Sequence, residues 1–96
     1  MSSVDFLNEL KLIINLESYY KFRNNIKSLM FLAESNKELY DDYITNLECL
    51  EYNIAFNDSV KSSCIDLINN AKDILLLDKS LSENEKIEIS NFTYTN

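Results

Sequence analysis

Residues 60–77 read VKSSCIDLINNAKDILLL, and their apolar side chains recur at the three- and four-residue spacing of an amphipathic α-helix. The predicted buried stripe of this helix consists of Val60, Cys64, Leu67, Ile68, Ala71, Ile74 and Leu75. Ile65, Leu76 and Leu77 lie off that stripe. They indicate either a central helix buried on all sides or an exposed apolar surface for a partner or a second copy of the chain. A helix this apolar requires other helices around it, so this stretch decides the fold.

Two stripes with helical spacing lie in the N-terminal third of the chain. Ser3 is the expected N-cap of a first helix, whose apolar face comprises Phe6, Leu7, Leu10, Ile13 and Ile14. The second stripe comprises Tyr19, Phe22, Ile26, Leu29, Met30 and Ala33. The stripes are out of phase, so either two helices break near residues 15–18 or one long helix rotates its buried face there. Ser18 is a good N-cap residue and favours the break.

Two later helix starts carry a capping box, in which a serine and a glutamate three residues on satisfy backbone N–H groups. Ser35 and Glu38 form the first box. The helix that follows is expected to bury Tyr40, Ile44, Leu47, Leu50 and Ile54. Residues 57–59, Asn-Asp-Ser, predict a turn and cap before the helix at 60–77. Ser82 and Glu85 open a short C-terminal segment, for which we favour a short helix and a tail over a docked strand.

These elements predict an all-α fold, a small antiparallel (up-down) bundle of three to four main helices plus a short C-terminal segment, in a single domain over residues 1–96. The chain has no glycine and no proline, which argues against β-sandwiches, barrels and glycine-rich phosphate loops. Its longest apolar runs, residues 29–33 and 74–77, are too short to span a membrane, and its start does not resemble a signal peptide. With two isolated cysteines, we expect a cytoplasmic protein with reduced thiols.

Residues suited to catalysis or metal binding are scarce. The chain has no histidine, which is the usual general base and the commonest metal ligand. Cys64 lies on a predicted apolar face and is interpreted as a core residue, whereas Cys49 is expected to be either a partly exposed thiol or a residue covered by a neighbouring helix. Asp41 and Asp42 are adjacent, and adjacent residues of a helix diverge by about 100°, so they do not share a site. We therefore expect no enzyme activity, no cofactor and no bound metal.

The most informative feature is an acidic face on the predicted third helix. Residues 34–51 contain six acids and one lysine, a local charge of −5. When the helix is projected at about 100° per residue, its outward side carries one continuous stripe of Asp41, Thr45, Glu48 and Tyr52. Asp42 flanks this stripe. Packing does not require an aromatic residue at the position of Tyr52. Interfaces are enriched in tyrosine and use acidic patches to steer basic partners, so this face is a candidate binding surface; the alternative is an ordinary solvated helix face.

A basic stretch precedes the acidic face. Between residues 11 and 28, Glu17 is the lone acid against Lys11, Lys21, Arg23 and Lys27, with aromatic residues interleaved. Such a stretch can track single-stranded nucleic acid, but we expect a basic helix that packs beside acidic neighbours. The net charge of −7 likewise disfavours direct contact with nucleic acid or with an anionic membrane.

No motif in the chain assigns it to a family. In its small size, its acidity and its lack of catalytic residues it resembles bacterial toxin immunity proteins and phage-encoded inhibitors. The resemblance implies an intracellular protein that neutralises a basic partner, such as a toxin or nuclease domain. From the acidic face we expect Asp41, Asp42, Thr45, Glu48 and Tyr52 to make the contact. Two alternatives stay open. One is a structural or adaptor bundle that self-associates into a homo-oligomer through the leucines outside the predicted apolar stripes, Leu12, Leu16, Leu32, Leu76 and Leu77. The other is a phage-encoded inhibitor of a host defence or nucleic-acid-binding protein.

Overall fold

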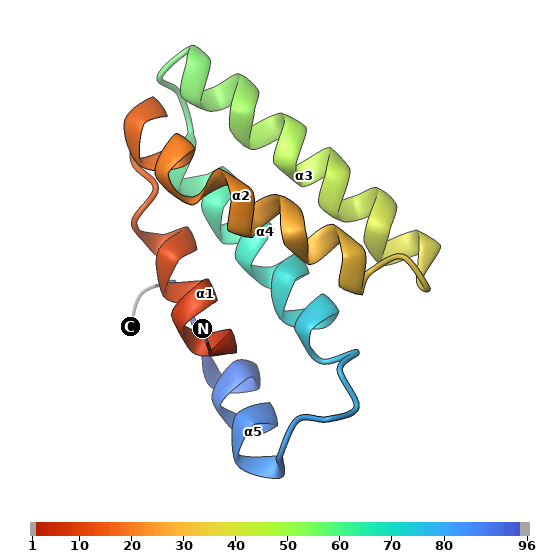
Figure 1. Ribbon diagram of the computed structural model, residues 1–96. Helices are drawn as coiled ribbons and strands as arrows, with labels where there is room; N and C mark the ends of the chain where they lie inside the picture. The colour runs from red at the N-terminus through yellow and green to blue at the C-terminus, as the bar shows by residue number, and fades with distance from the viewer. Residues whose placement is uncertain (1, 95–96) are drawn as a thin grey trace.

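Helix α4 (Val60–Leu75) lies at the centre of the computed structural model, which describes residues 2–94 (Figure 1). Within this part of the chain it is the one helix that contacts all the others, namely α1 (Ser3–Lys11), α2 (Leu16–Leu32), α3 (Lys37–Ala55) and α5 (Glu83–Asn91). Helices α2, α3 and α4 alternate in direction, and no strand occurs in the described residues. The predicted all-α up-down bundle is confirmed.

The predicted apolar stripes meet in one hydrophobic cluster around α4. All five helices and the α1–α2 connection contribute large side chains that are fully buried: Leu7, Leu10, Ile13, Ile26, Tyr43, Leu50, Leu67, Ile68, Ile74 and Ile89. Burial of apolar area is the main favourable contribution to folding, at roughly 25 cal/mol per Å². The fold therefore depends on keeping α4 covered.

Two polar pairs cross the contact between α3 and α4. The Asn46 amide donates a hydrogen bond to the side-chain oxygen of the buried Asn70 at 3.2 Å, and the Asn53 amide donates to the buried Ser63 hydroxyl. Because a buried polar group without a partner is costly, these pairs fix the rotation of one helix against the other.

The structure corrects the expected buried set at five positions. Ile14, expected on the first apolar face, is 67% exposed, because α1 ends at Lys11 and Ile13 is the residue of the connection that turns inward. The other four are only partly buried: Met30, Tyr40, Ile44 and Val60. The inward line of α3 instead runs through Tyr43, which the periodicity analysis missed.

The helix starts also differ from those predicted. Helix α1 is capped by Ser2 and not by Ser3, and α3 is capped by Asn36, which accepts from the Leu39 N–H at 3.1 Å, and not by Ser35. The predicted break between the first two helices is confirmed, but its N-cap is Asn15. Serine and asparagine are about equally good N-caps, so adjacent candidates cannot be ranked from residue type alone.

Residues 57–59 form the predicted turn before α4. Asn57 and Ser59 both adopt the left-handed region, with φ of 52° and 51°. Asparagine tolerates this conformation better than most residues, which suits a turn in a chain without glycine. Ser59 occupies the N-cap position of α4, but its side chain makes no capping hydrogen bond.

The C-terminal segment forms the favoured short helix, α5, and its predicted capping box between Ser82 and Glu85 is present. Ile89 and Phe92 bury their side chains in the core. The Lys72 ammonium of α4 donates to the carbonyl oxygens of Ser90 and Phe92 at 3.0 and 2.7 Å, and so satisfies carbonyls at the end of α5. The expected tail is described as far as residue 94, and residues 95–96 lie outside the described part.

The Tyr43 side chain gives a test of this packing, because its buried hydroxyl donates to the Ile26 carbonyl of α2 at 2.7 Å. We expect Tyr43→Phe to lower the free energy of unfolding by about 1 kcal/mol, since the bond is lost without a change of shape. The matched control is Tyr52→Phe at an exposed position, for which we expect less than about 0.5 kcal/mol. Urea denaturation measures both, and equal effects would contradict the assigned role of the hydroxyl.

Candidate protein-binding face

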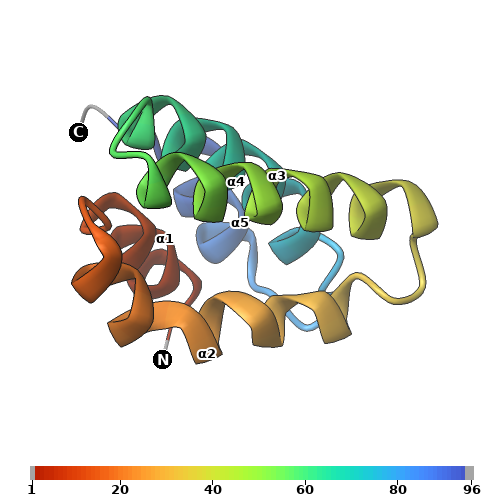
Figure 2. The same ribbon diagram turned by 90° about the horizontal axis from the view of Figure 1, so that it is seen from above.

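The outward side of α3 carries the five residues that the sequence singled out for partner binding. All five are exposed, and we call them the α3 outer face: Asp41, Asp42, Thr45, Glu48 and Tyr52. Seen from above (Figure 2), α3 lies along the near side of the molecule, with α2 on one side and α4 on the other. The helix places these residues opposite its inward line, which is anchored on α4 and α2, so a rigid element presents the face.

The structure divides the α3 outer face between two sides of the helix. Asp42 and Thr45 border a shallow hollow of about 250 Å³ on the α4 side, together with Asn46 and Asp73. Glu48 lies on the opposite flank and lines a separate hollow that faces α2. The residues thus form a curved strip across the top of α3 and do not converge on one point. A strip of this shape suits contact with a surface better than capture of a small ligand.

Two aromatic rings extend the strip at its C-terminal end. Tyr52 is 64% exposed and Phe56 is 66% exposed, and their ring centroids lie 4.6 Å apart. Phe56 was not predicted as a site residue, although its position four residues after Tyr52 was visible in the sequence. An exposed aromatic pair beside carboxylates offers apolar contact area next to a charged rim, the combination found where interfaces concentrate their binding energy.

The acids of residues 34–51 are not all available at this face. Asp41 accepts from Lys37 at 2.7 Å in an exposed pair, which contributes little to stability and can exchange for another cation. Glu51 lies on the α2 flank and accepts a hydrogen bond from the Tyr19 hydroxyl. Burial, then the Glu51 carboxylate, raises the pKa of Tyr19 well above its ordinary value. Glu51 therefore helps to hold α2 against α3.

The basic stretch lies mainly on α2, which packs beside the acidic α3. Arg23 shares a hollow with Glu51, and Lys27 shares one with Glu48 and Glu51. The ammonium of Lys21 lies 5.4 Å from the centre of the Phe22 ring, a cation–π contact. Basic and acidic side chains thus line opposite sides of one boundary between helices.

The two cysteines lie in contrasting surroundings, and the prediction of Cys64 as a core residue is confirmed. Cys49 is exposed on α3, whereas Cys64 is buried and its thiol points to the Ile13 carbonyl oxygen at 3.6 Å. Burial raises the pKa of the Cys64 thiol to about 11, so at neutral pH it carries almost no reactive thiolate.

Neither a metal site nor a membrane-spanning helix is present in residues 2–94. No three histidine, cysteine, aspartate or glutamate side chains gather there closely enough to hold a metal ion. None of the helices in this range combines the length and apolar character needed to cross a membrane.

Comparison with protein-family models, with curated proteins and with solved structures finds no significant match to this chain.

The thiols provide a direct test of burial. At pH 8 we expect an aromatic disulfide reagent to modify one thiol per folded chain rapidly, and Cys49→Ser to abolish that phase. Cys64→Ser should leave the rapid phase intact. Rapid modification of both thiols in the folded protein would contradict the assigned environment of Cys64.

The same thiol links stability to pH. A thiol in the unfolded chain titrates near pH 8.5, below the pKa of about 11 for Cys64 in the folded state. Its contribution to stability is therefore complete below about pH 8 and is lost as the pH rises toward 11. We expect Cys64→Ala to make the free energy of unfolding fall less steeply with pH than it does in the native chain. Urea denaturation of both proteins at several pH values in this range measures the two slopes. An unchanged slope would contradict the raised pKa.

Proposed function

We propose that this chain is a small acidic intracellular binding protein that neutralises one basic protein partner, in the manner of an immunity or antitoxin-type inhibitor of a toxin such as a nuclease. Its location would be the cytoplasm, and it would act by binding, without catalysis or a cofactor. The α3 outer face would make the contact, with Tyr52 and Phe56 at its aromatic end.

One observation carries the proposal: all five residues of the α3 outer face are exposed, and α3 is held from behind by α4. A rigid face loses little conformational freedom on binding, which favours affinity. The net charge of −7 adds long-range attraction toward a basic surface and raises the rate of association. Many nucleic-acid-cleaving proteins need a basic cleft for their substrate, and an acidic cover blocks such a cleft.

Charge reversal on this face tests the proposal. The chain is tagged, expressed in its source cells and isolated with its partner, and affinity is then measured with the purified pair. We expect Asp41→Lys with Asp42→Lys to weaken binding by about 10- to 100-fold, mainly through slower association, while the circular dichroism spectrum stays unchanged.

A matched control separates the local face from the total charge. Asp66→Lys with Glu88→Lys makes the same change in net charge at exposed positions on α4 and α5. We expect this variant to lose much less affinity and to retain binding at moderate salt. Equal losses in the two variants, or a loss in neither, would contradict the assignment of the α3 outer face.

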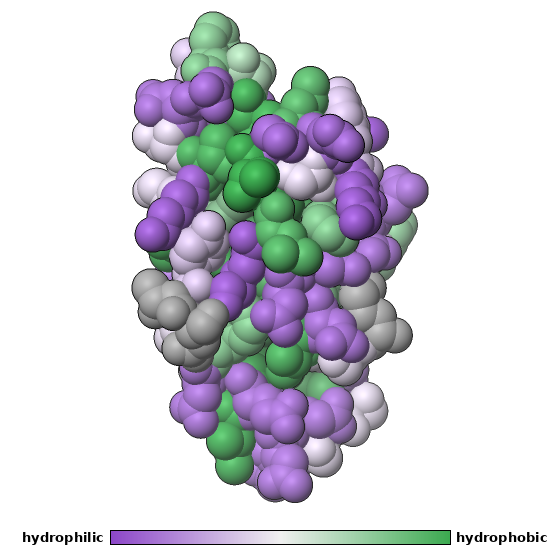
Figure 3. Space-filling view, turned by 90° about the vertical axis from the view of Figure 1, so that its left-hand side faces the viewer, coloured by the Kyte–Doolittle hydropathy of each residue, from purple (hydrophilic) through white to green (hydrophobic). Residues whose placement is uncertain are grey.

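Self-association is the second candidate function, and a different surface favours it. Leu12, Ile14 and Leu16, in or beside the α1–α2 connection, are 60%, 67% and 49% exposed. Figure 3 views the side of the molecule where α1 leads into α2, and apolar side chains gather on the upper half of that face. Exposed apolar groups of this kind mark contact sites in other proteins.

Mass measurement by light scattering distinguishes the two functions. The inhibitor proposal predicts a monomer of 11.2 kDa for the purified chain at micromolar concentration. A stable homo-oligomer that Ile14→Ser with Leu16→Ser converts to monomer would favour the structural or adaptor function instead.

A further inference from the structure

Three neighbouring hollows follow one another along the boundary between α2 and α3, and we call them together the groove; the Tyr19–Glu51 hydrogen bond crosses this boundary where Glu51 lines both the second and the third hollow. Their volumes are about 270, 330 and 270 Å³. Lys27 and Met30 line both the first and the second hollow, and Glu51 lines both the second and the third. The groove thus runs nearly the length of α2, from Phe31 near its end to Leu16 at its start.

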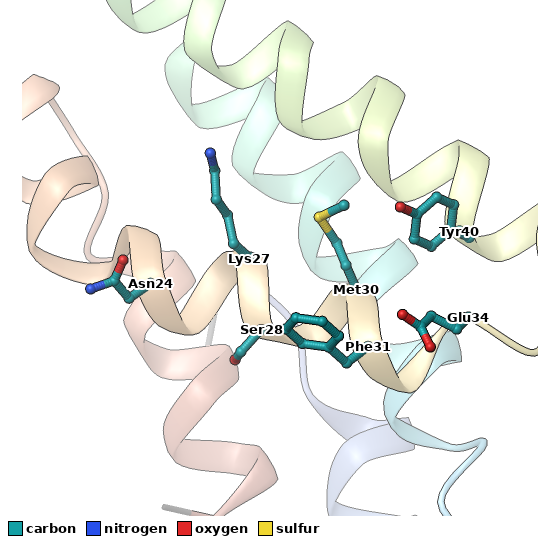
Figure 4. A pocket seen from close by; sticks show the side chains of 7 residues that line it. All are labelled: Asn24, Lys27, Ser28, Met30, Phe31, Glu34 and Tyr40. Atoms are coloured by element: carbon teal, nitrogen blue, oxygen red, sulfur yellow. The ribbon is translucent and has the colours of Figure 1, made fainter.

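The floor of the groove is apolar. Met30 and Ile44 are partly buried in the second hollow, and the buried Leu47 lines the same hollow. In the close-up of the first hollow (Figure 4), Lys27 and Met30 extend from α2 toward α3, and Tyr40 reaches back from α3. The groove exists because the contact between α2 and α3 is looser than the contact between α4 and α3. Half-covered apolar side chains at its bottom would gain from further burial.

The two walls of the groove carry opposite charges. Arg23 and Lys27 stand on the α2 wall, and Glu48 and Glu51 stand on the α3 wall. Within residues 2–94 no ion pair spans the groove; the two salt bridges are the local ones from Lys37 to Asp41 and from Lys86 to Glu83. Lys27 and Glu48 therefore offer charges of opposite sign to an occupant, whereas Glu51 already accepts a hydrogen bond from Tyr19, and Glu34, just beyond α2, adds an acid to the first hollow.

We infer that this groove binds an amphipathic α-helix from a partner protein, with acidic side chains along its α2 side and basic side chains along its α3 side. The apolar stripe of the helix covers Met30, Ile44 and Leu47. A helix fits because its backbone groups are satisfied internally, whereas an extended peptide would meet walls made of helices and no strand edge among the described residues.

The groove also sets the length and the ends of its occupant. Helix α2 has 17 residues, or about 25 Å of rise, which matches a partner helix of four to five turns. Leu16 and Phe31, 49% and 74% exposed, stand near the two ends and add apolar contact there. This inference does not rest on the proposed inhibitor function, since Glu48 is the one residue that the groove shares with the α3 outer face.

A peptide selection tests the groove without knowledge of the natural partner. The probe is a displayed library of 18-residue helical peptides with a fixed apolar stripe, in which the positions on both flanks vary among glutamate, lysine and serine. Selection on the immobilised full chain should enrich glutamate on one flank and lysine on the other. No enrichment, or enrichment without this asymmetry between the flanks, would overturn the inference.

Variants then locate the selected peptide. Lys27→Glu should weaken its binding by about tenfold or more, because an acidic flank then meets an acidic wall. Lys79→Glu, the same charge change at an exposed position outside the groove, should change affinity by less than about twofold. Equal effects of the two variants would overturn the inference.

The variant Asp41→Lys with Asp42→Lys distinguishes failure of the groove inference from failure of the inhibitor proposal. These residues line none of the three hollows, so this variant should bind the selected peptide as the native chain does. Loss of peptide binding in this variant would place the peptide on the α3 outer face and overturn the groove assignment.

Discussion

The burial of α4 is the constraint on which the rest of the structure depends. Its apolar surface is too wide for one neighbour, so α1, α2, α3 and α5 each turn an inward line toward it. Helix α3 makes the closest contact, fixed by the Asn46–Asn70 and Asn53–Ser63 pairs. Once that contact is set, the opposite side of α3 has to face solvent. The α3 outer face is therefore exposed because the inward side of α3 covers α4.

The same arrangement separates the charges of the chain. Basic side chains lie on α2 and acidic side chains on α3, and the two helices meet along a boundary that is held near one end by the Tyr19–Glu51 hydrogen bond and near its middle by Tyr43 and Ile26. Beside these links the boundary is hollowed, and Lys27 of α2 and Glu48 of α3 place opposite charges on the two sides of its middle hollow. We propose a basic protein surface as the partner of the α3 outer face and a helix as the occupant of the groove, which are two distinct modes of contact.

Periodicity in the sequence was enough to predict the helices, the bundle and the outward position of the acidic strip, because a helix with one apolar line has one opposite side. Three features could not be predicted from periodicity. The caps at Ser2 and Asn36 compete with equally good neighbours. The buried position of Tyr43 depends on a rotation of α3 that α2 and α4 set together. The groove depends on the distance between two helices, which only the packing on α4 decides.

Photocrosslinking from position 52 tests most directly the claim that the outer face of α3 binds a partner. The chain is expressed in its source cells with p-benzoylphenylalanine in place of Tyr52, or in place of Lys79 as the control, and irradiated. The account predicts a single covalent adduct with a basic protein from position 52 and none from position 79. No adduct from position 52, an adduct between two copies of the chain, or the same adducts from both positions would contradict it.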